Sequence, residues 1–275
     1  MLKSTSHVEE KEQSIEKQLK ELLVLLEDSK DFKKFGDLFD DKFLKQFIRG
    51  KKYDTVKACE YIQNYLYLRT DRFAEFSRTL RPSITPLINH GMLRMLKRSD
   101  QEGRIVVLDR VSRWDVSIFD AECGIRNWVL MADEILRSLD AACSKGVVVL
   151  LDFGDYSYSQ ARLLTPSVVL RAMNMLVNCM PMRYKGVHFI NHGHLVNMLV
   201  TGVRPFLKKK LRNRIHTHSS TASLHAHIAS DILPECYDGQ LTEDDAFDEE
   251  FEKRIFTRED FYEKFAERIQ SPGKA

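Results

Sequence analysis

Hydrophobic residues in the first third of the chain recur every three or four positions. This spacing places them on one face of a helix. The apolar positions of the first predicted helix are Ile15, Leu19, Leu22, Leu23 and Leu26. Asp40 or Asp41 is suited to cap the next helix and Asp54 the one after it, because an Asp side chain accepts hydrogen bonds from the first-turn backbone N–H groups. The pattern predicts a helical domain over residues 1–90, with 1–13 as a loose polar segment.

Near residue 93 the apolar period changes from helical to alternating. The runs 92–97 and 104–109 read as strands, and Gly103 turns the chain between them. Residues 147–151 are apolar on both faces, which favours a strand buried inside a sheet. Gly186 starts a second buried strand over 187–190. Their helical neighbours are predicted over 118–139 and from Pro166 onward.

The order helix–strand–helix–strand across 118–190 indicates a mixed sheet with right-handed crossovers. The predicted fold class is α/β, a helical N-terminal domain followed by a mixed β-sheet flanked by helices. We expect the second domain to span 91–245. Residues 246–275 are expected to form a polar, amphipathic C-terminal tail.

The segment 193–215 has two different surfaces. Leu195, Leu199 and Val203 recur every four residues, and Pro205 separates this helix from a second one. The basic residues that crowd the second helix are Lys208, Lys209, Lys210, Arg212 and Arg214. Taken alone, this pattern is typical of a surface helix with a solvated basic face. The alternative is a movable lid, apolar toward a cavity and basic toward an anionic membrane.

Composition narrows the possible partners and the compartment. The 42 Lys and Arg residues nearly balance the 40 Asp and Glu residues, so net charge does not indicate a nucleic-acid partner. The five cysteines form no CxxC pair, which argues against a zinc site and a disulfide scaffold. The polar N-terminus predicts no signal peptide, and no apolar run reaches the roughly 18 residues of a membrane span. We therefore expect a cytoplasmic protein whose membrane contact is peripheral.

Motifs that carry known chemistry are absent from the sequence. It contains no GxxxxGK[ST], GxGxxG or GxSxG motif. Asp152 follows a buried strand, where α/β enzymes place catalytic groups, but capping the next turn explains it. Histidines gather over 188–194 and 216–227 without the convergent spacing of a metal site. We expect no enzymatic activity, no metal and no cofactor.

Several short motifs occur in a recognisable order along residues 15–240. They are the stretch 40–54, the run 64–69 and the segments 146–154, 164–168, 186–191, 203–207 and 232–235. In these motifs the chain resembles the CRAL-TRIO (Sec14-like) lipid-transfer family, in particular its tocopherol- and retinaldehyde-binding branch. Two departures are Asp238, where the family has Gly, and Gly193, where it has Pro.

The resemblance implies a cage around a buried hydrophobic ligand, closed by a gate helix over about 195–207. The implied ligand-binding positions are Val129, Asp133, Val147, Leu151, Tyr158, Leu164, Met175, Leu176, Met180, Met182, Val187, Leu199, Val203 and Leu207. Tyr158 or Asp133 would supply the polar contact to the ligand. The implied phosphoinositide-binding residues are Lys51, Arg183, Lys185, Lys210 and Arg214.

The function that the resemblance implies is that of a non-enzymatic intracellular carrier. It would bind a small hydrophobic lipid, such as a tocopherol or retinoid, and exchange it at phosphoinositide-containing membranes. Its association with endosomal or other internal membranes would be transient and peripheral. The alternative is a phosphoinositide-tethered adaptor that exchanges no cargo.

Overall fold

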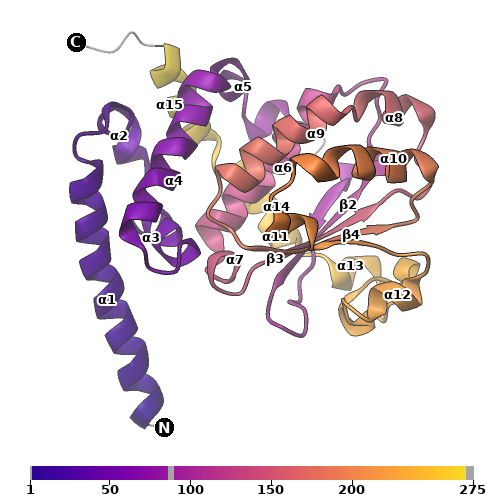
Figure 1. The fold of residues 1–275 in the computed structure, drawn as a ribbon, viewed down its shortest axis with the longest axis horizontal. Coiled ribbons are helices and arrows are strands. Elements are labelled where there is room, and N and C mark those ends of the chain that lie inside the picture. The colour runs from indigo at the N-terminus through magenta and orange to yellow at the C-terminus, as the bar shows by residue number, and fades with distance from the viewer. Residues whose placement is uncertain (1, 86–89, 271–275) are drawn as a thin grey trace.

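The N-terminal part of the molecule is built from packed helices, as predicted. The computed structural model describes residues 2–85 and 90–270. The helices of this part are α1 (Leu2–Leu26), α2 (Lys30–Phe35), α3 (Asp41–Gly50), α4 (Thr55–Tyr67) and α5 (Ala74–Arg78). The predicted caps are confirmed, because Asp40 accepts a hydrogen bond from Phe43 N and Asp54 accepts one from Lys57 N. The prediction of a loose segment over 1–13 differs from the structure, in which α1 already begins at Leu2 (Figure 1).

A five-stranded mixed sheet forms the centre of the second part, which confirms the α/β prediction. The strands are β1 (Leu93–Met95), β2 (Ile105–Arg110), β3 (Val147–Asp152), β4 (Tyr184–Ile190) and β5 (Ile215–Thr217). They lie in sequence order, with β1 antiparallel to β2 and the other neighbours parallel. The sequence did not identify β5, a short strand that follows the basic segment.

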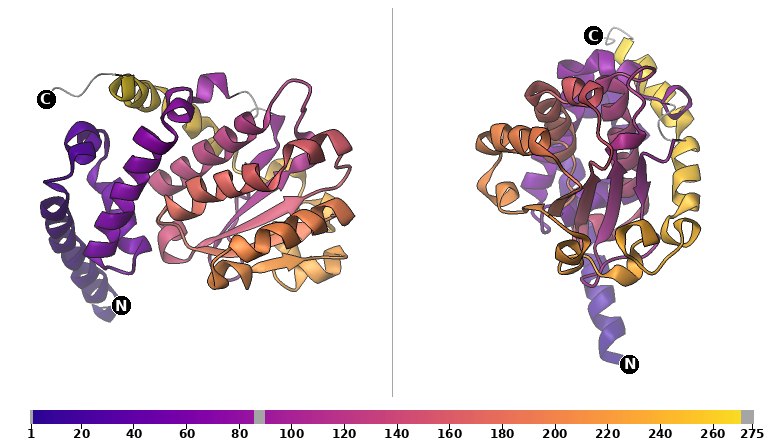
Figure 2. Two further views of the ribbon diagram at one scale, coloured as in Figure 1. Left: turned by 45° about the horizontal axis from the view of Figure 1, so that its top comes forward. Right: turned by 90° about the vertical axis from the view of Figure 1, so that its right-hand side faces the viewer.

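Helices cover one face of the sheet and a largely irregular stretch covers the other (Figure 2). The helical layer contains α6 (Ala121–Ser138), α7 (Ala141–Ser144), α8 (Tyr158–Leu163), α9 (Pro166–Met173) with the π-turn η6 (Asn174–Asn178), α10 (His194–Val203) with the 3₁₀ turn η7 (Arg204–Phe206), and α11 (Lys209–Arg212). The opposite face packs on residues 224–247, which include part of α12 (Thr221–His225) and α13 (Glu243–Ala246). Because side chains alternate along β2, Leu108 faces this second layer while Asp109 faces the helices.

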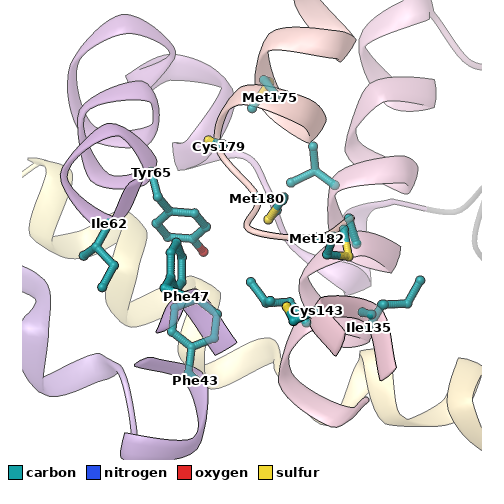
Figure 3. Close-up of a cluster of buried hydrophobic side chains, with 14 of the residues drawn as sticks. Phe43, Phe47, Ile62, Tyr65, Ile135, Cys143, Met175, Cys179, Met180 and Met182 are labelled. Carbon is teal, nitrogen blue, oxygen red and sulfur yellow. The ribbon is translucent and has the colours of Figure 1, made fainter. Parts of the chain in front are cut away.

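The helical N-terminal part packs directly against the α/β part. Figure 3 shows Phe43, Phe47 and Tyr65 opposite Met180 and other buried side chains of the second part. All of them belong to one continuous buried cluster. The two parts therefore share a core rather than meeting across a solvated linker.

The C-terminal segment closes the structure over the N-terminal helices. It forms α14 (Glu249–Phe256) and α15 (Glu259–Gln270). The rings of Phe35 and Phe265 lie 4.7 Å apart, and the Arg268 guanidinium pairs with Asp37. Across the described residues, no helix has both the length and the apolar character that a membrane crossing requires.

Candidate functional site: an apolar cavity beside a cationic cleft

An apolar cavity of about 260 Å³ lies between the sheet and the helices α6, α9 and α10. Its wall on the sheet side consists of Asp109, Val149, Leu151, Tyr184, Val187, Phe189 and Ile215. The helical side includes Gly124, Ile125, Trp128, Val168, Val169, Ala172, Met173, Leu176, Val177, Leu199, Val200 and Val203. Helices α9 and α10 lie side by side over the sheet, so together they roof this cavity (Figure 1).

Many of the positions that the resemblance implied lie on this cavity wall. They are Leu151, Leu164, Leu176, Val187, Leu199, Val203 and Leu207. Leu199 and Val203 lie one turn apart on α10, as the four-residue period predicted. The inner face of the predicted gate helix thus contributes directly to the cavity.

The other implied ligand positions lie elsewhere. Val129, Val147, Met175 and Met180 are packed into the core shared with the N-terminal helices (Figure 3). Met182 lies at the edge of that core and lines a second hollow, between the N-terminal helices and the segment 206–214. Tyr158 is on α8 with 72% of its surface exposed, so its hydroxyl does not point into the cavity.

Asp133 is buried in a polar cluster away from the cavity. Its carboxylate oxygens lie 2.9 Å from the guanidinium nitrogens of Arg69, and both side chains are almost completely buried. Tyr262 donates a hydrogen bond of 2.9 Å to Asp133 Oδ2, and Tyr65 lies 3.4 Å from Oδ1. This cluster joins α4, α6 and α15, so Asp133 has the partners that a buried carboxylate requires.

One carboxyl group does line the cavity, and sequence reasoning missed it. Asp109 lies one residue before the end of β2, and its Oδ2 accepts a hydrogen bond of 2.7 Å from Trp128 Nε1. Burial raises the pKa of Asp109 to about 7, against the hydrogen bond from Trp128 and with a further increase from the charge of Asp152. In the sequence this group is visible only as an acidic residue near the end of an otherwise apolar run.

A second hollow, the cationic cleft, lies between the N-terminal helices and the segment 206–214. It has a volume of about 530 Å³. Its basic lining residues are Lys51, Lys52, Arg183, Lys185, Lys208, Lys210 and Arg214. These include all five implied phosphoinositide-binding residues, and Lys52 and Lys208 were not predicted. No carboxylate lines the cleft among the described residues.

The crowding of positive charge is visible in the lysine pKa values. Burial, together with the charges of Lys208, Lys210 and Arg183, lowers the pKa of Lys51 to about 8. Its ammonium lies over the ring of Tyr61. The neighbouring Arg214, followed by burial, lowers the pKa of Lys210. The basic side chains of the cleft thus repel one another, and an anion bound among them would relieve this repulsion.

Backbone contacts hold the cleft in shape. Arg183 donates hydrogen bonds to the carbonyl oxygens of Arg49 and Ser144, so it ties β4 to α3. A Cβ atom on Gly50 would lie 2.1 Å from the carbonyl oxygen of Pro181. Only glycine allows this close approach of the two parts of the molecule.

The cavity and the cationic cleft are separated by a shared wall. Met173, Val177, Tyr184, Leu207 and Leu211 line both. Leu207 follows the turn after α10, and Leu211 lies within α11 among its basic residues. A displacement of the segment 207–211 would therefore change both hollows together.

The histidines form a stacked cluster at the edge of the sheet. His188 Nδ1 lies 2.9 Å from His218 Nε2, and the His188 ring stacks on His216 at 4.8 Å. Burial, and next the charges of the other histidines, lower the pKa of His188 to about 3. Across residues 2–85 and 90–270 no group of His, Cys, Asp and Glu side chains is arranged to hold a metal ion.

Comparison with known proteins identifies the family. The model of the CRAL/TRIO domain matches residues 89–239, which are more than half of the chain. The chain belongs to the CRAL/TRIO family. The predicted family is thereby confirmed. The matched region contains the whole sheet and all three helices that surround the cavity.

Curated relatives and a solved structure agree with this CRAL/TRIO assignment. Alpha-tocopherol transfer protein-like from Mus musculus is 31% identical over 216 residues, which cover 78% of this chain. Clavesin-2 from Homo sapiens is 31% identical over 206 residues, which cover 74% of the chain. The matched region spans 62% of the length of each of these relatives. The crystal structure of Sfh5 has the same fold, with a TM-score of 0.59 at 13% identity over 90% of this chain and 96% of that one.

Proposed function

We propose that this CRAL/TRIO protein is a non-enzymatic carrier of a small hydrophobic lipid. It would hold the lipid in the apolar cavity and exchange it at membranes that contain phosphoinositides. The observation that carries this proposal is the wall shared by the apolar cavity and the cationic cleft. A carrier of this kind needs both a shelter for hydrocarbon and a means of sensing the membrane at which to release it.

The cavity supplies the shelter. Its lining is almost entirely hydrocarbon, and each CH₂ group that a ligand buries there contributes about 0.8 kcal/mol. A tocopherol, a retinoid or a lipid of similar size is the class of cargo that fits this chemistry, and a relative is named for tocopherol transfer.

Helix α10 has the properties of a movable cover. Its N-cap residue is Gly193, which provides no side-chain hydrogen bond to the first turn of the helix. Met198 on α10 and Phe206 just beyond it are 72% and 69% exposed, although both are apolar. Exposure to water is unfavourable for these apolar side chains, whereas at a bilayer they would be buried among the lipids.

The cationic cleft supplies the sensor. A phosphoinositide head group carries several negative charges, and the cleft offers seven basic side chains. Near an anionic bilayer each Lys or Arg gains on the order of 1 kcal/mol. For release to follow, the anion must bind the open form more tightly than the closed one. An anion held by Lys210 and Arg214 would do so by pulling on the segment that contains Leu207.

A transfer assay with paired variants tests the proposal. The test variant combines Lys210→Ala with Arg214→Ala, and the control combines Arg204→Ala with Lys209→Ala. The control removes the same charge from neighbouring positions that do not line the cleft. At low salt the test variant should transfer lipid between phosphoinositide vesicles about 30-fold more slowly, which corresponds to about 2 kcal/mol.

The same assay, with vesicle binding measured beside transfer, also distinguishes a carrier from an adaptor. Equal transfer rates for the test variant and the control would contradict the role of the cleft. Tight binding of the wild-type protein to the vesicles without any lipid transfer would instead support a phosphoinositide-tethered adaptor.

A further inference from the structure

The polar atoms that line the apolar cavity are few, and nearly all are paired within the protein. Trp114 Nε1 donates a hydrogen bond of 3.0 Å to the carbonyl oxygen of Phe119. The Tyr184 hydroxyl lies 3.4 Å from the carbonyl oxygen of Leu176. Trp128 Nε1 donates to Asp109 Oδ2 at 2.7 Å. These groups are satisfied without a ligand.

Asp109 Oδ1 is the exception among them. This oxygen is buried and has no hydrogen-bond partner in the described structure, and the whole side chain is only 3% exposed. A buried polar atom without a partner is uncommon in folded proteins, and each instance requires an explanation. Asp109 also faces the helical side of the sheet, where the cavity lies. The cavity is therefore the place from which a ligand could supply a partner for Oδ1.

The charges around Asp109 restrict what that partner can be. Burial, and to a smaller degree the charge of Asp152, raises the pKa of Asp109 to about 7. No Lys or Arg of the described residues lines the cavity. A fatty-acid carboxylate would therefore be repelled. An ammonium group would bring three N–H donors to a wall that has one free acceptor, which leaves most of its charge unsolvated.

A hydroxyl group avoids both difficulties. It donates to Oδ1 when Asp109 is ionised and accepts from the carboxyl proton when Asp109 is protonated. Since the geometry leaves one carboxyl oxygen free in an apolar wall, we propose that Asp109 binds the hydroxyl of a lipid alcohol and selects this class of ligand. This inference rests on the proposed carrier function, because it concerns the polar end of the same cavity.

Matched ligands of one chain length test the selection. The probes are dodecan-1-ol, its methyl ether, dodecylamine and dodecanoate. Trp114 and Trp128, which are the two tryptophans of the chain, both line the cavity, so intrinsic fluorescence reports its occupancy. In the wild-type protein the alcohol should bind about tenfold or more tightly than the ether, because the ether cannot donate to Oδ1.

Two variants separate a role in selection from a structural role. Asp109→Leu should weaken binding of the alcohol about tenfold and leave the ether at least as tightly bound as before. Asp109→Asn keeps the shape of the side chain, and its carbonyl oxygen would accept the hydrogen bond from Trp128 Nε1, which leaves the NH2 group as a donor only. Because this group can donate to an alcohol or an ether oxygen equally, the Asn variant should bind the two probes about equally. The Asn variant keeps the test decisive if the Leu variant does not fold.

The possible results are distinguishable. Equal binding of alcohol and ether to the wild-type protein, or an unchanged preference in Asp109→Leu, would overturn the selection by Asp109 while leaving the carrier function intact. Tightest binding of the amine or of dodecanoate would overturn it as well. Failure of all four probes to bind the wild-type protein would contradict the proposed function itself, and this inference with it.

Discussion

Replacing Gly124 with leucine should stabilise the lipid-free protein and abolish its lipid binding. Gly124 lies within α6 and lines the apolar cavity. A Cβ atom placed there would have a single neighbour within 4 Å, the Trp114 ring at 4.0 Å. A longer side chain at this position therefore has free space to enter, and that space is the one we assign to the lipid.

The size of the effect follows from the groups that are added. Four carbon atoms at about 0.8 kcal/mol each give about 3 kcal/mol. Removing glycine from a helix interior adds about 1 kcal/mol, and ordering the leucine side chain costs a similar amount. The free energy of unfolding should thus rise by about 3 kcal/mol. With a denaturant dependence of about 3 kcal/mol per molar urea, the unfolding midpoint should move up by about 1 M.

Urea unfolding followed by circular dichroism, on delipidated protein, measures this change. Gly124→Ala is the matched control, because it gains only the helix term of about 1 kcal/mol and leaves the cavity open. The leucine variant should also lose vesicle-to-vesicle lipid transfer, whereas the alanine variant should keep it. If the interior were solid, leucine would overpack it and destabilise the protein by about 1–3 kcal/mol. That result would refute the reasoning.

Three further predictions concern the cover, the domain junction and the histidine cluster. A Cβ on Gly202 of α10 would meet no atom within 4 Å, so Gly202→Ala should stabilise this helix by about 1 kcal/mol. If α10 must loosen for release, lipid transfer should slow about fivefold. An unchanged transfer rate would contradict that requirement. Asp133→Asn should cost about 3–5 kcal/mol in urea unfolding, because Arg69 would remain buried without its counter-charge, and a loss below about 1 kcal/mol would contradict this. The lowered pKa of His188 means that the unfolded chain binds the proton more readily, so stability is complete above about pH 6.5 and falls by about 2 kcal/mol by pH 5. His188→Leu should lose that part of the pH dependence, and an equal loss in wild type and variant would rule out His188 as its source.

Local patterns were sufficient for the predictions that depended on one element at a time. The unbroken apolar run 147–151 and the four-residue period of Leu199 and Val203 follow from strand and helix geometry. The faces of these elements that line the cavity follow from that geometry. The same holds for the caps at Asp40 and Asp54, which act within a single turn.

Features that depend on how distant segments meet could not be read in this way. Met175 and Met180 were assigned to the cavity, yet they pack against the N-terminal helices, which approach from far away in the sequence. Asp133 appeared available to a ligand until the positions of Arg69 and Tyr262 were known. Asp109 looked like an ordinary polar strand end, because its orientation depends on the register of β2 in the sheet.

Organic extraction of the purified protein, followed by mass spectrometry, tests the central claim most directly. If the cavity beneath α10 holds cargo, the wild-type extract should contain a hydrophobic lipid in an amount equimolar with the protein. The Gly124→Leu extract should lack it. A wild-type extract without lipid, or equal amounts of lipid from both proteins, would contradict the account.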